Sequence, residues 1–255
     1  MHGLDLTILA PAFVAGLLVL STHVPLGQEV LRRGIIFIDI AIAQIAGLGV
    51  ILAAQFGFEP QGLAMQLTAT ASALLGAWGL SVLARRRRSE IQEALIGICF
   101  VLAATGGIIL LANNPHGGEH LRELLVGQIL WITWPQLIAP ALASAAILLL
   151  WFPCKFGINR ELGFYLLFAV AVTLSVQLVG VYLVFATLII PALAGRRYPG
   201  RRALVTAYLV GGLGYGFGLI LSSILDLPSG AVIVWAIGGV ALAGYFFEPA
   251  AEIPR

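Results

Sequence analysis

Apolar runs of about 20 residues recur along the whole chain, and only short polar connections separate them. A helix needs about 20 mostly apolar residues to cross the hydrocarbon core of a bilayer, where its backbone groups must be hydrogen-bonded internally. The runs therefore predict an all-α, polytopic membrane protein with eight to nine transmembrane helices. Their approximate ranges are 6–26, 34–54, 63–83, 92–112, 123–152, 161–179, 180–195, 203–222 and 230–247.

Two parts of this pattern do not fit a single straight helix. The run 123–152 is too long for one crossing and contains Trp131-Ile-Thr-Trp134-Pro135, so we expect a kink or a short interfacial segment before the crossing. The stretch 161–195 contains Val179-Gly180 and Pro191. It predicts one span followed by a short or re-entrant helix.

The composition excludes several functional classes. Only 10% of the 255 residues are charged, whereas a soluble domain has about a quarter, so we exclude a soluble enzyme and a nucleic-acid-binding protein. The spans leave no room for a catalytic domain, and residues 1–255 are expected to form one transmembrane domain. The single lysine, Lys155, lacks the glycine-rich sequence of a phosphate-binding loop, so we expect neither an ATP site of that kind nor enzymatic activity.

The basic residues predict an orientation in the membrane. If Arg32 and Arg33 face the cytoplasm and the runs alternate in direction, thirteen of the fourteen Lys and Arg residues lie on the cytoplasmic side and only Arg122 lies outside. Basic residues in short loops resist translocation. We therefore expect a multi-pass protein of the cytoplasmic (inner) membrane, with its N-terminus outside and its C-terminus inside.

Glycines cluster in the run 203–222. The pairs Gly212/Gly216 and Gly214/Gly218 have the four-residue spacing that lets membrane helices approach closely. We expect both pairs to serve helix packing.

Five segments, in the same order along the chain, resemble those of permease subunits of ABC transporters for zinc and manganese uptake. In that family an arginine pair and an aromatic residue precede an aspartate in the next span, and a Leu-Ile-Ile-Pro-Ala segment and an Asp-Leu-Pro-Ser/Thr-Gly turn follow later. The resemblance covers nearly the whole chain. The matching segments are Pro25 to Asp39, Glu93 to Ile98, Leu125 to Leu130, Val179 to Ala192 and Asp226 to Gly230.

This resemblance implies a metal-type ABC importer permease fold and a set of partners. The permease would form a homodimer with a translocation path at or near its interface. Two cytoplasmic ATPase subunits and an extracytoplasmic metal-binding protein would complete the importer in the lipid bilayer. Zn²⁺ or Mn²⁺ would be the transported substrate, with no cofactor bound by this chain.

Asp39 is the leading candidate for contact with the ion, because it is the only acidic residue well inside an apolar run. A carboxylate at that depth costs roughly 2.5–3.5 kcal/mol on insertion scales. If the helix were continuous from Arg33, Asp39 would lie roughly 9 Å further along it. The alternative to an ion contact is a carboxylate paired with Arg33 or with a neighbouring helix.

The residues around Asp39 depart from the family pattern. Zinc and manganese permeases commonly carry a histidine four residues after this aspartate, and Ala43 occupies that position here. Gln44 follows, but it shares a helical face with Asp39 only if the helix is distorted. His23 offers a compensation, and we hypothesise that it contacts the ion together with Asp39. The alternative is a histidine bonded to helix backbone or to lipid headgroups.

An outer connection carries a second candidate group, His116, Glu119 and His120. These residues match the His-x-x-Glu-His string of some metallopeptidases, but Pro115-His-Gly-Gly predicts a turn, so we interpret the match as accidental. Two imidazoles and a carboxylate could still make a transient Zn²⁺ contact. The alternative is a solvated loop that contacts the binding protein.

Two cytoplasmic segments are candidates for docking the ATPase. The connection 153–161 stands where the family has a longer docking helix, and it looks shortened. The run Arg85–Arg88 either assists docking or serves only to anchor the topology.

Weaker candidates and rival functions remain open. Gln177, Tyr182 and Thr187 could line the path or could simply bond other helices. The missing histidine favours a permease of the same architecture for a metal chelate or another small solute. Two further alternatives are an ATP-independent carrier or channel, and a structural membrane subunit with no transport path.

Overall fold

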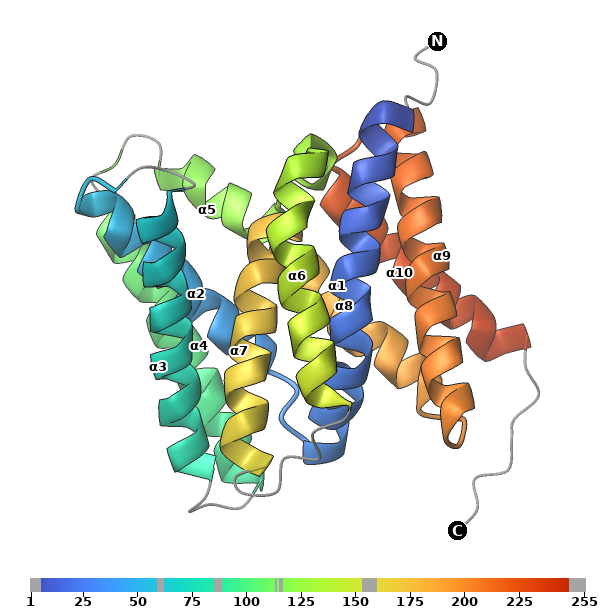
Figure 1. The fold of residues 1–255 in the computed structure, drawn as a ribbon, viewed down its shortest axis with the longest axis horizontal. Helices are drawn as coiled ribbons and strands as arrows, with labels where there is room; N and C mark the ends of the chain where they lie inside the picture. The colour runs from blue at the N-terminus through green and yellow to red at the C-terminus, as the bar shows by residue number, and fades with distance from the viewer. Residues whose placement is uncertain are drawn as a thin grey trace.

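The computed structural model describes residues 6–58, 62–84, 89–112, 114, 117–152 and 160–247, and these residues are helical apart from short connections (Figure 1). No strand occurs among them, which confirms the all-α prediction. The elements are α1 Leu6–Arg33, α2 Ile38–Gln55, α3 Leu63–Ala84, α4 Ser89–Leu111, α5 Gly117–Val126, the 3₁₀ turn η1 Ile129–Trp131, α6 Trp134–Trp151, α7 Arg160–Val179, α8 Val181–Gly195, α9 Arg201–Leu225 and α10 Ser229–Phe247.

Most of the long helices run between the same two ends of the molecule (Figure 1). Within the described residues, seven helices are long and apolar enough to cross a membrane: α1, α2, α3, α4, α6, α7 and α9. Two shorter apolar helices, Val181–Gly195 and Ser229–Tyr245, complete the nine expected segments. The polytopic membrane fold is therefore confirmed.

The two irregular stretches break where the sequence predicts. The run 123–152 divides into the end of α5, the turn η1 and α6, and α6 begins with a capping box between Thr133 and Gln136. Gly180 separates α7 from α8 with φ +82°, and Gly127, with φ +71°, lies against it. A Cβ on Gly180 would come within 2.7 Å of the Gly127 Cα, so this backbone contact requires glycine.

Helix α1 is longer than the sequence pattern suggests. It spans 28 residues, through Pro25 and on to Arg33, instead of ending near residue 26. Glu29 pairs with Arg32 at 2.6 Å and with Arg33 at 2.7 Å, and such pairs stabilise a last helical turn. The chain then turns at Gly34 (φ +70°), and α2 begins only at Ile38. The placement of Asp39 roughly 9 Å along one helix from Arg33 is therefore wrong, because the two residues belong to different helices.

The short helix α8 forms the centre of one half of the molecule. It packs most extensively against α1, α9 and α10, and it also contacts α2, α5 and α7. Gly27 of α1 leaves no room for a Cβ beside the backbone of Leu188, and Gly195 leaves none beside Ala203. Small residues thus allow the neighbouring backbones to approach α8 closely.

The glycines of α9 divide into two kinds. Gly214 and Gly218 face α10, where an added Cβ would lie 2.7 Å from the Ile237 Cα and 2.6 Å from the Ile233 Cα. This confirms the packing role of that pair. The role expected for Gly212 and Gly216 is wrong, because Gly212 has no neighbour within 4 Å and Gly216 meets only a Phe13 ring atom at 3.8 Å.

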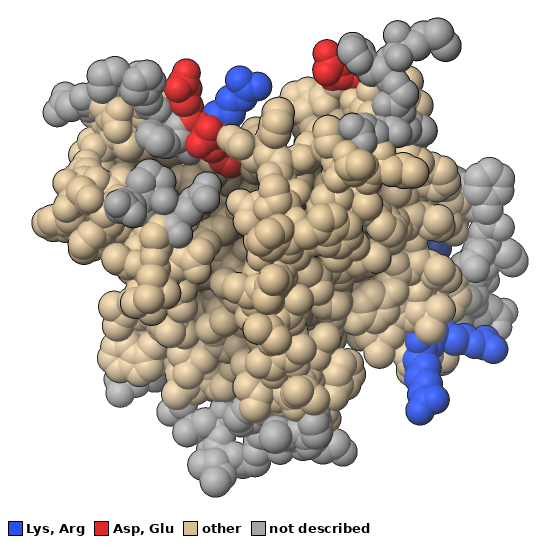
Figure 2. Space-filling model, turned by 45° about the horizontal axis from the view of Figure 1, so that its top comes forward, with Lys and Arg blue, Asp and Glu red and all other residues tan. Residues whose placement is uncertain are grey.

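Charged side chains on the face shown in Figure 2 gather near the two ends, with an uncharged band between them. At one end, where α1 finishes and α9 begins, lie Arg32, Arg33, Arg196, Arg197, Arg201 and Arg202, which we call the basic end. Exposed Glu119, Arg122 and Glu123 of α5 lie at the opposite end. Among the described residues, the arginines of the basic end are thus separated from α5 by the length of the bundle.

The α9–α10 contact generates the first prediction. Replacing Gly214 or Gly218 with alanine should lower the free energy of unfolding by about 1–3 kcal/mol, because the new methyl group overlaps the α10 backbone. Gly212→Ala, on the same helix, should leave stability unchanged or slightly raised. Thermal unfolding of the purified protein in one detergent compares the three variants. Equal losses in all three would contradict this account.

Candidate functional site

Asp39 is the second residue of α2 and is almost completely buried, with 1% of its surface exposed. Its Oδ1 atom has no hydrogen-bond partner. The ion pairs among the described residues leave Arg33 with Glu29, and the Arg33 guanidinium also lies 4.3 Å from the centre of the Phe164 ring. The Asp39–Arg33 pair considered from the sequence is therefore not formed, and a carboxylate oxygen remains available at this depth.

His23 lies in α1 and is fully buried. Its Nδ1 atom is 2.9 Å from the Val19 carbonyl oxygen and 3.1 Å from the Thr22 hydroxyl. Donation from Nδ1 to the carbonyl assigns the proton to that nitrogen and leaves Nε2 as an acceptor, and Nε2 has no partner. The imidazole is thus anchored to helix backbone, as the alternative for this residue proposes, and still presents one free lone pair.

Asp39 and His23 belong to helices with largely different neighbours. Helix α1 packs mainly on α8, α9 and α6, whereas α2 packs mainly on α3, α4 and α7. Both helices contact α7 and α8. A joint His23–Asp39 contact with one ion stays a prediction.

A groove of about 730 Å³ lies between α2, α4, α5, α8 and α10. Its lining is almost entirely apolar. Gln44 of α2 contributes a side-chain amide to it, and Tyr182 of α8 contributes a hydroxyl group. Gln44 is half-buried, whereas Tyr182 is 55% exposed and Trp235 of α10 is 83% exposed. Among the expected path residues, Gln44 and Tyr182 are therefore brought together along one groove, and Asp39 and His23 do not line it.

The other two weak candidates behave differently. The Thr187 hydroxyl donates to the Leu183 carbonyl at 2.6 Å and lies 2.8 Å from the Tyr215 hydroxyl, in a buried position between α8 and α9. Its polar atoms are thus used in helix packing. Gln177 is exposed on α7.

The candidates for ion capture on the outer side and for ATPase docking on the cytoplasmic side are only partly described. His116 and the segments 85–88 and 153–159 lie outside the described residues, so ion capture and ATPase docking stay predictions there. Glu119 lies exposed in the first turn of α5, and His120 follows it in the same helix. The expected loop is therefore helical from Gly117, whose N–H donates to the Asn114 carbonyl at 2.9 Å.

The structure also shows what kind of ion site these residues can form. Within the described part of the chain, no group of three or more His, Cys, Asp or Glu side chains is arranged to hold a metal. Asp39 Oδ1 and His23 Nε2 have no hydrogen-bond partner, so each offers one atom that could coordinate a metal ion. Isolated donors suit a path along which an ion binds weakly and leaves again.

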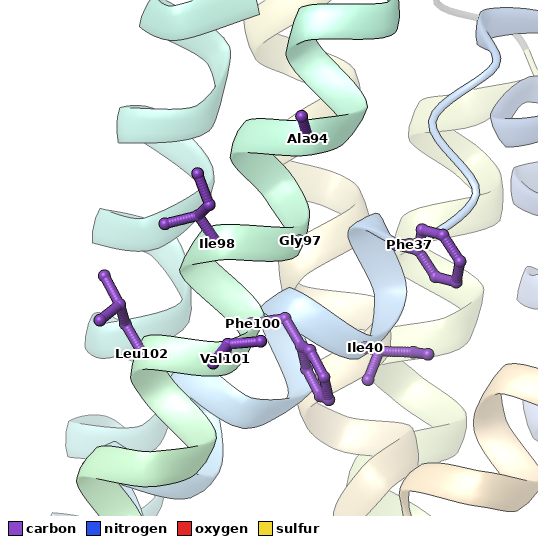
Figure 3. A pocket seen from close by; sticks show the side chains of 8 residues that line it. All are labelled: Phe37, Ile40, Ala94, Gly97, Ile98, Phe100, Val101 and Leu102. Atoms are coloured by element: carbon purple, nitrogen blue, oxygen red, sulfur yellow. The ribbon is translucent and has the colours of Figure 1, made fainter.

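A second, smaller pocket of about 560 Å³ lies between the start of α2 and α4 (Figure 3). Phe37 and Ile40 of α2 border it on one side, and apolar residues of α4 from Ala94 to Leu102 on the other. No charged or polar side chain lines it. This pocket contains no ligand for an ion. It lies between α2 and α4 at the turn that holds Asp39.

One polar residue at this place enters the sequence analysis only as the start of a matching segment and not as a site candidate. Glu93 of α4 accepts a hydrogen bond from the backbone N–H of Phe37 at 3.1 Å. The sequence shows only a glutamate near the edge of an apolar run, and nothing in it indicates a bond 56 residues away.

Comparison with known proteins places this architecture among transporters. The family model described as "ABC 3 transport family" matches residues 5–156 and 157–248. "Probable metal transport system membrane protein" of Thermotoga maritima is 29% identical, with 90% of this chain and 86% of that protein covered. "Manganese transport system membrane protein MntC" of Halalkalibacterium halodurans is 25% identical, with 96% and 89% covered.

Two further comparisons extend this picture. "Chelated iron transport system membrane protein YfeC" of Yersinia pestis is 26% identical over 62% of this chain and 60% of that protein. The solved structure of PsaBC from Streptococcus pneumoniae in complex with Fab superimposes with a TM-score of 0.73, at 21% identity, covering 95% of this chain and 92% of that one. This last likeness confirms the fold.

Proposed function

Because the chain belongs to the ABC 3 transport family, we propose that it is the permease subunit of an importer that carries a divalent transition metal ion, Zn²⁺ or Mn²⁺, across the cytoplasmic membrane. The observation that carries this proposal is the buried Asp39 carboxylate with an unpaired oxygen in a membrane-spanning bundle. Burial of an unpaired carboxylate is costly, and such residues in membrane proteins serve ion pathways. The name of the manganese-transport relative supports the same class of substrate.

A chelated metal is the second candidate substrate, and two observations favour it. Ala43 replaces the histidine that would complete a two-residue ligand set with Asp39. A relative that aligns with 62% of this chain is named for chelated iron transport. A chelate carries its own ligands and needs fewer from the permease.

The energy source in this proposal is a separate ATPase. The sequence around Lys155 lacks a phosphate-binding loop. ATPase subunits would dock at the cytoplasmic face, for which the segments 85–88 and 153–161 are the candidates. We place the basic end in the cytoplasm, because basic residues in short loops resist translocation.

The partner permease in this proposal is a second copy that covers the groove. Gln44 and Tyr182 would otherwise present polar groups to lipid, which is unfavourable at membrane depth. Exposed Trp235 borders the same groove and would be covered with it. Two facing copies would enclose this groove between α2, α8 and α10 as one part of the path, with Gln44 on its wall, and Asp39 would belong to another part, next in the chain to Ile40 at the border of the groove.

On the outer side, a binding protein would deliver the metal to the end that carries α5. There His116, Glu119 and His120 would hold the ion transiently, since imidazole and carboxylate are ordinary Zn²⁺ ligands.

The main prediction concerns Asp39. Asp39→Asn should reduce uptake of radioactive Zn²⁺ or Mn²⁺ by the reconstituted complex by roughly 10- to 100-fold, because the ion loses an anionic ligand. Thr105→Val, which removes an exposed polar group from α4, should leave uptake unchanged. Uptake by the Asp39 variant at the wild-type rate would contradict an ion path through this residue.

Liposomes that contain this chain without an ATPase should show no uptake, and uptake there would favour the carrier or channel.

A second prediction tests the dimer. In a background with Cys99 and Cys154 replaced by alanine, Trp235→Cys should form a covalent dimer with a short bismaleimide in membranes. Leu142→Cys on α6, which is 69% exposed, is the matched control and should stay monomeric. Equal cross-linking at both positions would contradict an interface at the groove.

A third prediction tests ion capture. Replacing both His116 and His120 with alanine should slow uptake at low metal concentration and leave uptake at saturating concentration unchanged. A concentration series with the wild-type complex as reference separates the two regimes. Identical curves for both complexes would exclude a role for these imidazoles.

A further inference from the structure

The start of α2 is capped by a residue from another helix. Phe37 is the N-cap of α2, and its own side chain forms no capping hydrogen bond. Instead its backbone N–H donates to the Glu93 carboxylate of α4 at 3.1 Å, and the backbone amide of Ile36 also interacts with that carboxylate. The first N–H groups of a helix lack partners within the helix, and a carboxylate is the acceptor best suited to them.

This bond joins two helices at the edge of an apolar pocket. Further along, the pair is close, because a Cβ on Gly107 of α4 would lie 3.2 Å from Ile51 of α2. At the start of α2 the apolar pocket separates the same helices, and Phe37 and Ala94 border it from the two sides (Figure 3). The contacts that Glu93 makes there are polar, and both are with backbone amides that lead into α2.

The capped turn is also the turn that holds Asp39. Asp39 follows Phe37 by two residues, and the Ala41 N–H returns to the Phe37 carbonyl at 3.1 Å, so the carboxylate belongs to the first turn that Phe37 begins. A displacement of Phe37 away from α4 therefore moves Asp39 with it.

We propose that Glu93 is a positioning residue for transport: it latches the start of α2 to α4 and thereby sets the place of the Asp39 carboxylate in the ion path. The inference rests on the proposed role of Asp39. Glu93 acts through a hydrogen-bond acceptor atom and does not itself contact the ion. Breaking the latch releases the first turn of α2 toward the pocket.

The test separates the acceptor atom from the charge. Glu93→Gln keeps an accepting oxygen, whereas Glu93→Ala removes it. Gln92→Ala is the matched control, since the neighbouring Gln92 amide donates to the Tyr165 hydroxyl of α7 at 2.5 Å and leaves α2 untouched.

Hydrogen exchange of the full-length protein in nanodiscs reads the latch directly. Glu93→Ala should speed exchange of the amides in segment 36–41 by about tenfold, as expected when one hydrogen bond to a charged acceptor is lost. Glu93→Gln should stay near the wild type, and Gln92→Ala should leave this segment unchanged. Unchanged exchange in Glu93→Ala, or an equal increase in both Glu93 variants, overturns the proposal. If Glu93→Ala does not fold, Glu93→Asp, one methylene too short to reach, takes its place with the same expected result.

Metal uptake by the reconstituted complex measures how the loss of the Glu93–Phe37 bond affects transport. Glu93→Ala should reduce Mn²⁺ uptake about tenfold, Glu93→Gln should restore most of it, and adding Glu93→Ala to Asp39→Asn should cause no further loss. A further loss in the double variant overturns the link to Asp39. If Asp39→Asn alone transports normally, the proposed ion path fails, and the exchange measurement still decides whether the latch exists.

Discussion

Close approach of helix backbones is the constraint on which this structure depends. Lipid is as apolar as the helix surfaces, so burial of apolar side chains does little to hold membrane helices together, and packing and interhelical hydrogen bonds must do so. The helices around α8 meet this requirement with small residues. Gly27 of α1 and Gly195 of α8 let backbones touch, and Gly127 and Gly180 bring two chain breaks together. These contacts fix α8, which lines the groove, against α1 and α9 and join the end of α5 to the start of α8.

Polar side chains inside the bundle form hydrogen bonds, with few exceptions. The hydroxyls of Thr173 and Thr187 donate to carbonyls of their own helices, so they cost little in the apolar interior. Among the described residues, four buried side-chain atoms lack a partner: His23 Nε2, Gln28 Nε2, Asp39 Oδ1 and Glu93 Oε2. His23 and Asp39 are candidates for the proposed ion path, and Glu93 is the residue proposed to position Asp39. The open atoms of His23 and Asp39 are the two to which a transported ion would supply the missing contact in the proposed path.

The sequence predicts the elements better than it predicts the contacts between them. Hydrophobic run length locates the spans, and Gly180 and the Trp131–Pro135 stretch locate the breaks, because these signals are local in the chain. The end of α1 is missed because the pairing of Glu29 with Arg32 and Arg33 extends the helix beyond its apolar part. The different fates of Gly212 and Gly214 depend on which face of α9 meets α10, and spacing alone does not tell which.

The candidate site shows the same limit. Asp39 stands out from the sequence because a carboxylate in an apolar run is rare. The structure buries this carboxylate, and its contact with an ion stays a prediction. Glu93 does not stand out as a site candidate, because its bond to Phe37 joins two helices and no local pattern in the sequence indicates it. The groove that unites Gln44 with Tyr182 likewise arises only when α2 and α8 are folded against each other.

The brevity of α8 has a consequence for the membrane around the protein. Its 15 residues reach about 22 Å at 1.5 Å per residue, against a hydrocarbon core about 30 Å thick, and Arg196 and Arg197 follow at its end. These guanidinium groups reach water if α8 begins inside the bundle, if the bilayer beside α8 becomes thinner, or if the arginine side chains extend to the surface. Thinning would shorten the dehydrated distance that an ion crosses, so the acyl-chain length of the surrounding lipid becomes a variable that acts on the transporter itself.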